Sequence, residues 1–220
     1  LGRLSRTSAY VTATTYGALP EVDAAVDIVK RIHKRVNGVS ERGVRYDASD
    51  PAFSAWVHNA LTDSFLVANQ IYGAAPLSPG DADTFVREQR KVGALLYADP
   101  MPETAADLHI WVAEHPAVAA SQAMRDAVAF INDPPLSRGI AMSYKVLRNA
   151  AVATIPVRIR HILGLTAPQG SRASAKAAVA GLRWAMGFSP TWKVALIRTG
   201  SVVPEGLFRQ PIPIALPVPE

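Results

Sequence analysis

The chain contains no cysteine. Disulfide bonds, cysteine-based zinc sites and catalysis by a thiol are therefore excluded. Without cysteine, the sequence does not indicate whether the protein resides in an oxidising or a reducing compartment. No stretch reaches the ~18 consecutive apolar residues that a membrane-spanning helix requires. The longest uncharged run, 64–80, contains two prolines, Gly73, Asn69 and Gln70. We therefore expect no transmembrane segment.

A signal-like segment is also missing from the beginning of the chain, which starts at Leu1 without a methionine. Secretory leaders carry a basic segment followed by an apolar one, and neither is present here. We expect that the true N-terminus lies outside this sequence. The compartment cannot be read from such a chain, and a cytoplasmic location is the favoured expectation.

Charged residues are scarce, at 19% of the chain against about a quarter in an average domain. The net charge is +5 and the isoelectric point is near 9.7, which raises the question of nucleic-acid binding. The basic residues are scattered, however, with no run of five or six and no aromatic residues alternating with them. We therefore expect no nucleic-acid partner, because a helical DNA-binding regulator would need a clustered basic recognition helix. The oligomeric state is left open.

The hydrophobic pattern is helical almost throughout, and it predicts an all-α protein. Apolar residues recur at helical spacing over 21–36, with Asn37 suited to a left-handed cap. Asp50-Pro51 is a helix-start signal. The helix that follows, to about Tyr72, is apolar on most sides, so we expect it to be buried. No alternating strand pattern and no Asn-Gly hairpin is found. At 220 residues, of which 49% are hydrophobic, one domain is expected over 1–220, with 205–220 an extended proline-rich tail.

Two of the five histidines, His33 and His58, lie on apolar helix faces. A single such histidine is usually a core residue, but each buried imidazole needs a partner. On two antiparallel helices they would lie ~5 Å and ~10 Å from the connecting loop, and so face one cavity. Arg31 and Arg35 flank His33 and are either surface charges or partners of an anionic cofactor group. The other three histidines, His109, His115 and His161, are expected to be half-exposed or at helix ends, where a cation suits the dipole.

An aspartate near the two histidines would allow a non-haem iron site. Asp47, Asp50 and Asp63 are the candidates, although Asp50 is better explained as a helix cap. A third interpretation treats both histidines as structural, in a protein that binds an apolar ligand or a partner. The familiar phosphate-binding, metalloprotease and hydrolase motifs are all absent.

Three short motifs follow one another in the region of these histidines: Arg31-Ile-His33 with Val36 and Gly38, then Tyr46-Asp-Ala48-Ser-Asp50-Pro51, then Trp56-Val57-His58. In this order they resemble the catalytic domain shared by the latex-clearing rubber oxygenases and the MpaB oxygenases. Looser matches extend the resemblance over most of the chain, among them Ile155-Pro156 with Arg158.

The resemblance implies a globin-like helical bundle that binds one haem b and uses O₂ to cleave a C=C bond of an isoprenoid-like chain. It implies that His58 is the axial ligand of the haem iron. Arg31 and His33 would be catalytic groups on the distal side, with Arg31 and Arg35 near the haem propionates. In the rubber oxygenases an Arg-x-x-Lys-Thr arrangement lies on this side. Here Arg35 stands where the threonine would be, so we expect a smaller apolar or lipid-like substrate rather than rubber.

Overall fold

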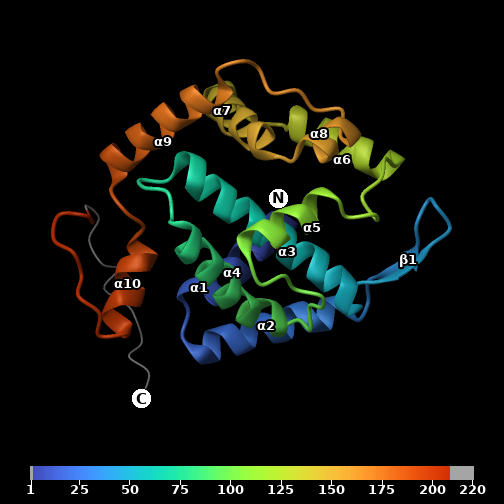
Figure 1. The fold of residues 1–220 in the computed structure, drawn as a ribbon, viewed down its shortest axis with the longest axis horizontal. Coiled ribbons are helices and arrows are strands. Elements are labelled where there is room, and N and C mark those ends of the chain that lie inside the picture. The colour runs from blue at the N-terminus through green and yellow to red at the C-terminus, as the bar shows by residue number, and fades with distance from the viewer. Residues whose placement is uncertain (1, 209–220) are drawn as a thin grey trace. The chain divides into compact units, whose positions relative to one another are not determined.

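The computed structural model describes residues 2–208, and over this range most of the chain is helical (Figure 1). This confirms the all-α prediction. Ten helices and one two-stranded sheet are present among the described residues. They are α1 (Gly2–Tyr16), α2 (Leu19–His33), β1 (Asn37–Val39), β2 (Arg45–Asp47), α3 (Pro51–Tyr72), α4 (Pro79–Ala94), α5 (Ala105–Ala113), α6 (Gln122–Asn132), α7 (Arg138–Thr154), α8 (Val157–Ile162), α9 (Ser171–Met186) and α10 (Pro190–Arg198).

The chain divides into two compact units, one formed by its two ends and the other by residues 30–178. In the first unit α1 packs on α10, and Arg198 pairs with Glu21 at 3.0 Å. The predicted tail of 205–220 lies largely outside the described residues. Its described beginning turns back, and Phe208 bridges to Gly187. The single domain and the globin-like arrangement stay predictions.

The second unit is built around α3, which packs on α4, α5 and α7, while α5 also packs on α4 and α8. Figure 1 shows α3, α4 and α5 close together in green and cyan. The side chains that fill this core come from four helices, because each presents its apolar stripe inward. They are Leu66, Ala82, Val86, Leu108, Val112 and Ile159. No helix among the described residues is long and apolar enough to cross a membrane.

The region between α2 and α3 differs from the prediction. The helix ends at His33 rather than Val36, and an antiparallel hairpin follows that pairs Asn37 with Asp47. Asn37 is therefore extended and not a left-handed cap. The hairpin was missed because its turn is longer than an Asn-Gly turn, with Gly43 supplying the positive φ of 73°. The Tyr46 ring covers Gly38, where a Cβ would come 2.9 Å from the Tyr46 hydroxyl.

The prediction that α3 is buried, because it is apolar on most sides, is confirmed for one face of the helix only. The helix begins as expected, with the Asp50 carboxylate accepting a hydrogen bond from Ala52 N at 2.8 Å. Its buried face, however, carries four polar side chains among six buried residues: Ser54, Ala55, Asn59, Thr62, Asp63 and Leu66. Phe53, Val57 and Phe65 are 44%, 56% and 46% exposed. Small and polar residues allow α4 and α5 to approach α3 closely, and this outweighs the burial of larger side chains.

Candidate functional site

His58 lies two turns into α3 and is half-buried. Burial lowers the pKa of its imidazole below the ordinary value of 6.5, and burial is the sole cause of that shift. No side chain of the described part of the chain hydrogen-bonds to the ring. At neutral pH the side chain is therefore a neutral imidazole without a protein partner. This is the protonation state in which histidine binds a metal.

The imidazole of His58 packs directly on the backbone of α4. A Cβ added at Gly93 would lie 2.8 Å from Cδ2 and 3.0 Å from Cγ of His58, and it would also collide with the sulfur of Met101. Ordinary contacts between carbon atoms are about 3.5–4.0 Å. The imidazole can lie against α4 only because residue 93 is glycine. This contact restricts the side-chain conformation of His58.

His58 also lies at the edge of the exposed apolar side of α3. Leu61 and Phe65 follow it by three and seven residues, which places all three on neighbouring faces of the helix. Val57 and Phe65 are about half exposed, and Leu61 is half-buried. The ring thus stands between the buried face of α3 and a strip of apolar surface that other described residues leave largely uncovered. An apolar group bound through His58 would cover this strip.

One loop, 95–104, ties the surroundings of both predicted histidines together. Lys30 Nζ donates a hydrogen bond to the Tyr97 hydroxyl at 3.2 Å and lies 4.3 Å from the centre of its ring. Asn59 Nδ2 donates to the Pro100 carbonyl at 3.0 Å. Lys30 is one turn before His33, and Asn59 is next to His58. The last turn of α2 and the second turn of α3 are therefore held by the same loop.

His33 is the last residue of α2 and is half-buried, whereas Arg31 and Arg35 are exposed. Arg31 lies roughly 160° around the helix from His33, since successive residues are about 100° apart. Neither guanidinium has an ion pair among the described side chains, and no bond or ring contact there joins His33 to His58. The structure ties the elements that carry the two histidines to one loop, without a direct contact between their side chains.

The three aspartates proposed for non-haem iron are all engaged elsewhere. Asp47 accepts a hydrogen bond from Ser49 N at 2.7 Å, and Asp50 caps α3, as expected. Asp63 is buried and lies 3.1 Å from His109 Nδ1. Over the residues that the structure describes, no group of three His, Asp or Glu side chains is arranged to hold a metal ion. A ligand set of His33, His58 and an aspartate is not assembled there.

The Asp63–His109 pair was missed at the level of sequence, although Asp63 is a carboxylate in the middle of an apolar helix. Such a residue needs a partner when it is buried. The carboxylate is 6% exposed and the imidazole 49% exposed. The pair joins α3 to α5 on the helix face next to Asn59, so it helps to fix the helix that carries His58.

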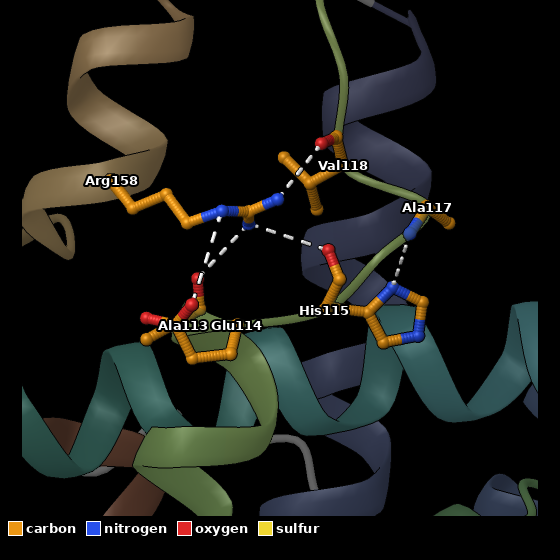
Figure 2. Close-up of polar contacts among 6 residues, drawn as sticks. All are labelled: Ala113, Glu114, His115, Ala117, Val118 and Arg158. Carbon is orange, nitrogen blue, oxygen red and sulfur yellow. Dashed lines mark hydrogen bonds and ion pairs between the residues drawn. The ribbon is translucent and has the colours of Figure 1, made fainter.

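The C-terminal end of α5 forms the other polar cluster of this unit (Figure 2). Arg158 donates to the carbonyls of Ala113 at 3.2 Å and His115 at 3.4 Å, as well as to that of Val118. A cation at the C-terminal end of a helix interacts favourably with the helix dipole. The expected cation there was His115, but burial and the charge of Arg158 lower the pKa of His115. Arg158 therefore takes the capping role.

His115 instead belongs to an aromatic cluster with the tryptophan of the Trp-Val-His motif. The ring of Trp56 lies 4.8 Å from that of His115 and 6.0 Å from that of Trp111, measured between centroids. Trp111 and His115 are 4.5 Å apart. Trp56 thus binds α3 to α5, while His58, two residues later, points toward α4. The motif therefore directs one aromatic anchor toward α5 and one imidazole toward α4.

Over residues 1–187 the chain matches the model of a family described as "ER-bound oxygenase mpaB/B'/Rubber oxygenase, catalytic domain". The matched range includes His33, His58 and the loop that ties their helices together. Comparison with curated proteins and with solved structures gives no match.

Proposed function

The chain belongs to the mpaB/rubber oxygenase family and carries its oxygenase catalytic domain, and from this premise we propose that it is a haem b-dependent oxygenase in which His58 is the axial iron ligand. The substrate that we propose is an apolar, unsaturated, isoprenoid-like molecule, which O₂ oxidises. The observation that carries the proposal is the His58 imidazole, which is neutral, has no hydrogen-bond partner within residues 2–208 and lies beside exposed apolar surface.

The residues around His58 suit a haem in three respects. A neutral imidazole supplies the lone pair that ferrous or ferric iron takes. The macrocycle is apolar, and Val57, Leu61 and Phe65 offer apolar surface on the same part of α3 as His58. Burying that surface contributes about 25 cal/mol per Å². Gly93 lies against Cδ2 and Cγ of the imidazole, so that the orientation of the ring is restricted before any ligand arrives.

When bound, the haem supplies the activation of O₂. The remaining tasks fall to this chain's own side chains. The apolar strip on α3 would keep water away from the bound macrocycle, with few polar groups needed for orientation. His33 would hold a proton at a ring nitrogen near the substrate, and Arg31 or Arg35 would neutralise carboxylates of the cofactor.

The proposed reaction balances without a reductant. Cleavage of a C=C bond by O₂ breaks both bonds of the alkene and places one oxygen atom on each carbon, which gives two carbonyl groups. The chain has no cysteine, and the reaction needs no thiol from the protein. Arg35 occupies the position of the threonine of the rubber oxygenases, which favours a prenyl compound of small or medium size over the polymer.

The decisive experiment is the absorption spectrum of the purified protein after reconstitution with haem b. We expect a Soret band in the wild type and in His161→Ala, a control that removes an exposed histidine of α8. His58→Ala should lose at least most of the bound haem, because the axial ligand is removed. Equal haem occupancy in the wild type and His58→Ala would contradict the assignment.

A second set of variants separates binding from turnover. His33→Ala and Arg31→Ala should keep at least part of the haem and lose O₂ uptake and carbonyl formation with a prenyl substrate. Retained turnover in both would remove them from the site. A colourless protein that binds stoichiometric iron would instead favour the non-haem alternative, and a protein that binds the substrate without haem or iron would favour an apolar-ligand carrier.

A further inference from the structure

The helices α6 and α7 carry an unusual concentration of exposed apolar side chains. Five large ones are at least half exposed within 130–147: Phe130, Ile131, Ile140, Met142 and Leu147, at 59%, 50%, 58%, 71% and 51%. Helix α6 buries no residue, and no residue from Gly139 to Leu147 is buried. Exposed apolar side chains that are concentrated in one part of a protein often mark an interaction surface.

The two helices form a defined structure and not a loose chain. The Tyr144 hydroxyl donates to the Ile131 carbonyl at 2.7 Å, and Arg148 donates to Asn132 Oδ1 at 2.6 and 2.9 Å. These bonds fix the end of α6 against α7 (Figure 1). The apolar side chains are therefore presented outward by a structured pair of helices, which we call the α6–α7 surface, residues 122–147.

Basic residues outnumber acidic ones in this part of the chain, since residues 122–148 contain four Lys or Arg and two Asp. Lys145 is exposed and has no carboxylate partner among the described residues. Among the described residues, Arg148 donates to the amide oxygens of Asn132 and Asn149, which do not compensate its charge. The acidic residues on this surface are Asp126 and Asp133, both on the α6 side.

We propose that the α6–α7 surface docks on the surface of a bilayer that contains anionic phospholipid. Exposed apolar side chains beside uncompensated basic ones are the pattern of helices that lie in a membrane interface, where the apolar side chains enter the acyl boundary and the basic ones meet anionic headgroups. A nucleic acid would use the charges but leave the apolar side chains in water. The docking does not depend on the proposed haem, and it would bring the protein to the phase into which an apolar substrate partitions.

The test is co-sedimentation of the full chain with sucrose-loaded vesicles, either of phosphatidylcholine alone or of phosphatidylcholine with phosphatidylserine. We expect binding to the anionic vesicles that weakens as salt is added, because salt screens exposed charges. Lys145→Gln should lower the partition coefficient about fivefold, the effect of one basic residue near such a surface. Met142→Gln should lower it about tenfold, as expected for an apolar side chain of this size.

Matched controls remove the same kinds of side chain elsewhere. Ile110→Gln on α5 removes an apolar residue that is 61% exposed, and Lys91→Gln on α4 removes an exposed lysine. Both should bind vesicles like the wild type. All four positions are exposed, so circular dichroism should show unchanged folding.

Three results would overturn the proposal. They are no binding to the anionic vesicles, binding that Met142→Gln leaves unchanged, and retention by a duplex DNA fragment that Lys145→Gln weakens while vesicles are not bound. The last result would show that the basic residues of the α6–α7 surface bind nucleic acid.

Discussion

Replacing Gly93 by alanine tests whether the His58 imidazole is held where the structure places it. The new methyl group would lie 2.8 Å from Cδ2 of His58, about 0.7–1.2 Å closer than an ordinary carbon contact. The Met101 sulfur can move away, since it lies near the end of a flexible side chain, but the ring cannot without moving α3. We expect overpacking to cost about 1–3 kcal/mol, offset by about 1 kcal/mol from the higher helix propensity of alanine.

Gly181→Ala supplies the matched control, because Gly181 is inside α9 and a Cβ there would meet nothing within 4 Å. It should raise the free energy of unfolding by about 1 kcal/mol, measured from urea-induced unfolding. Gly93→Ala should leave it unchanged or lower it by up to about 2 kcal/mol, and it should weaken haem binding, since the ring is displaced.

A double-mutant cycle isolates the contact. In a His58→Ala background the methyl group of Gly93→Ala no longer meets a ring, so most of the overpacking cost should disappear, which is a coupling of at least about 1 kcal/mol. Two results would refute the reasoning: equal stabilisation by Gly93→Ala and Gly181→Ala, or a coupling near zero.

Three further predictions concern the contacts that hold the helices of the second unit. Asp63→Asn should lower the free energy of unfolding by about 1–3 kcal/mol, because the buried carboxylate loses its charge-assisted bond to His109; an unchanged urea midpoint would refute this. Arg158→Ala should lower the free energy of unfolding by about 1–2 kcal/mol, since the end of α5 loses its cation. It should also alter the near-ultraviolet circular dichroism of Trp56 and Trp111, whereas Arg160→Ala should change neither the free energy of unfolding nor this spectrum. Glu41 accepts hydrogen bonds from the backbone of Gln122 at 2.8 Å and Ala123 at 2.9 Å, and these bonds lower its pKa. Its contribution to stability is therefore present above the ordinary pKa of a glutamate and is lost as the pH falls through the lowered value; Glu41→Gln should flatten the acid side of the stability profile, and an unaltered profile would contradict the contact.

The sequence predicted those features whose causes lie within a few residues of one another. The start of α3 follows from Asp50-Pro51, because a carboxylate at the N-cap and a proline in the first turn act locally. The all-α class follows from helical periodicity that persists through the chain. The family follows from motifs of fixed spacing, and the matched range of 1–187 confirms it.

Other features depended on contacts between distant segments, and the sequence could not supply them. The side of α3 that is buried was decided by how closely α4 and α5 approach, which favours small and polar residues at Ser54, Asn59 and Asp63 over Phe53 and Phe65. The neutral state of His58 follows from burial against Gly93, 35 positions later in the chain. The cation at the end of α5 came from Arg158 and not from the nearby His115. Spacing along a helix determines which residues share a face, but only the packing of other helices determines which face is covered.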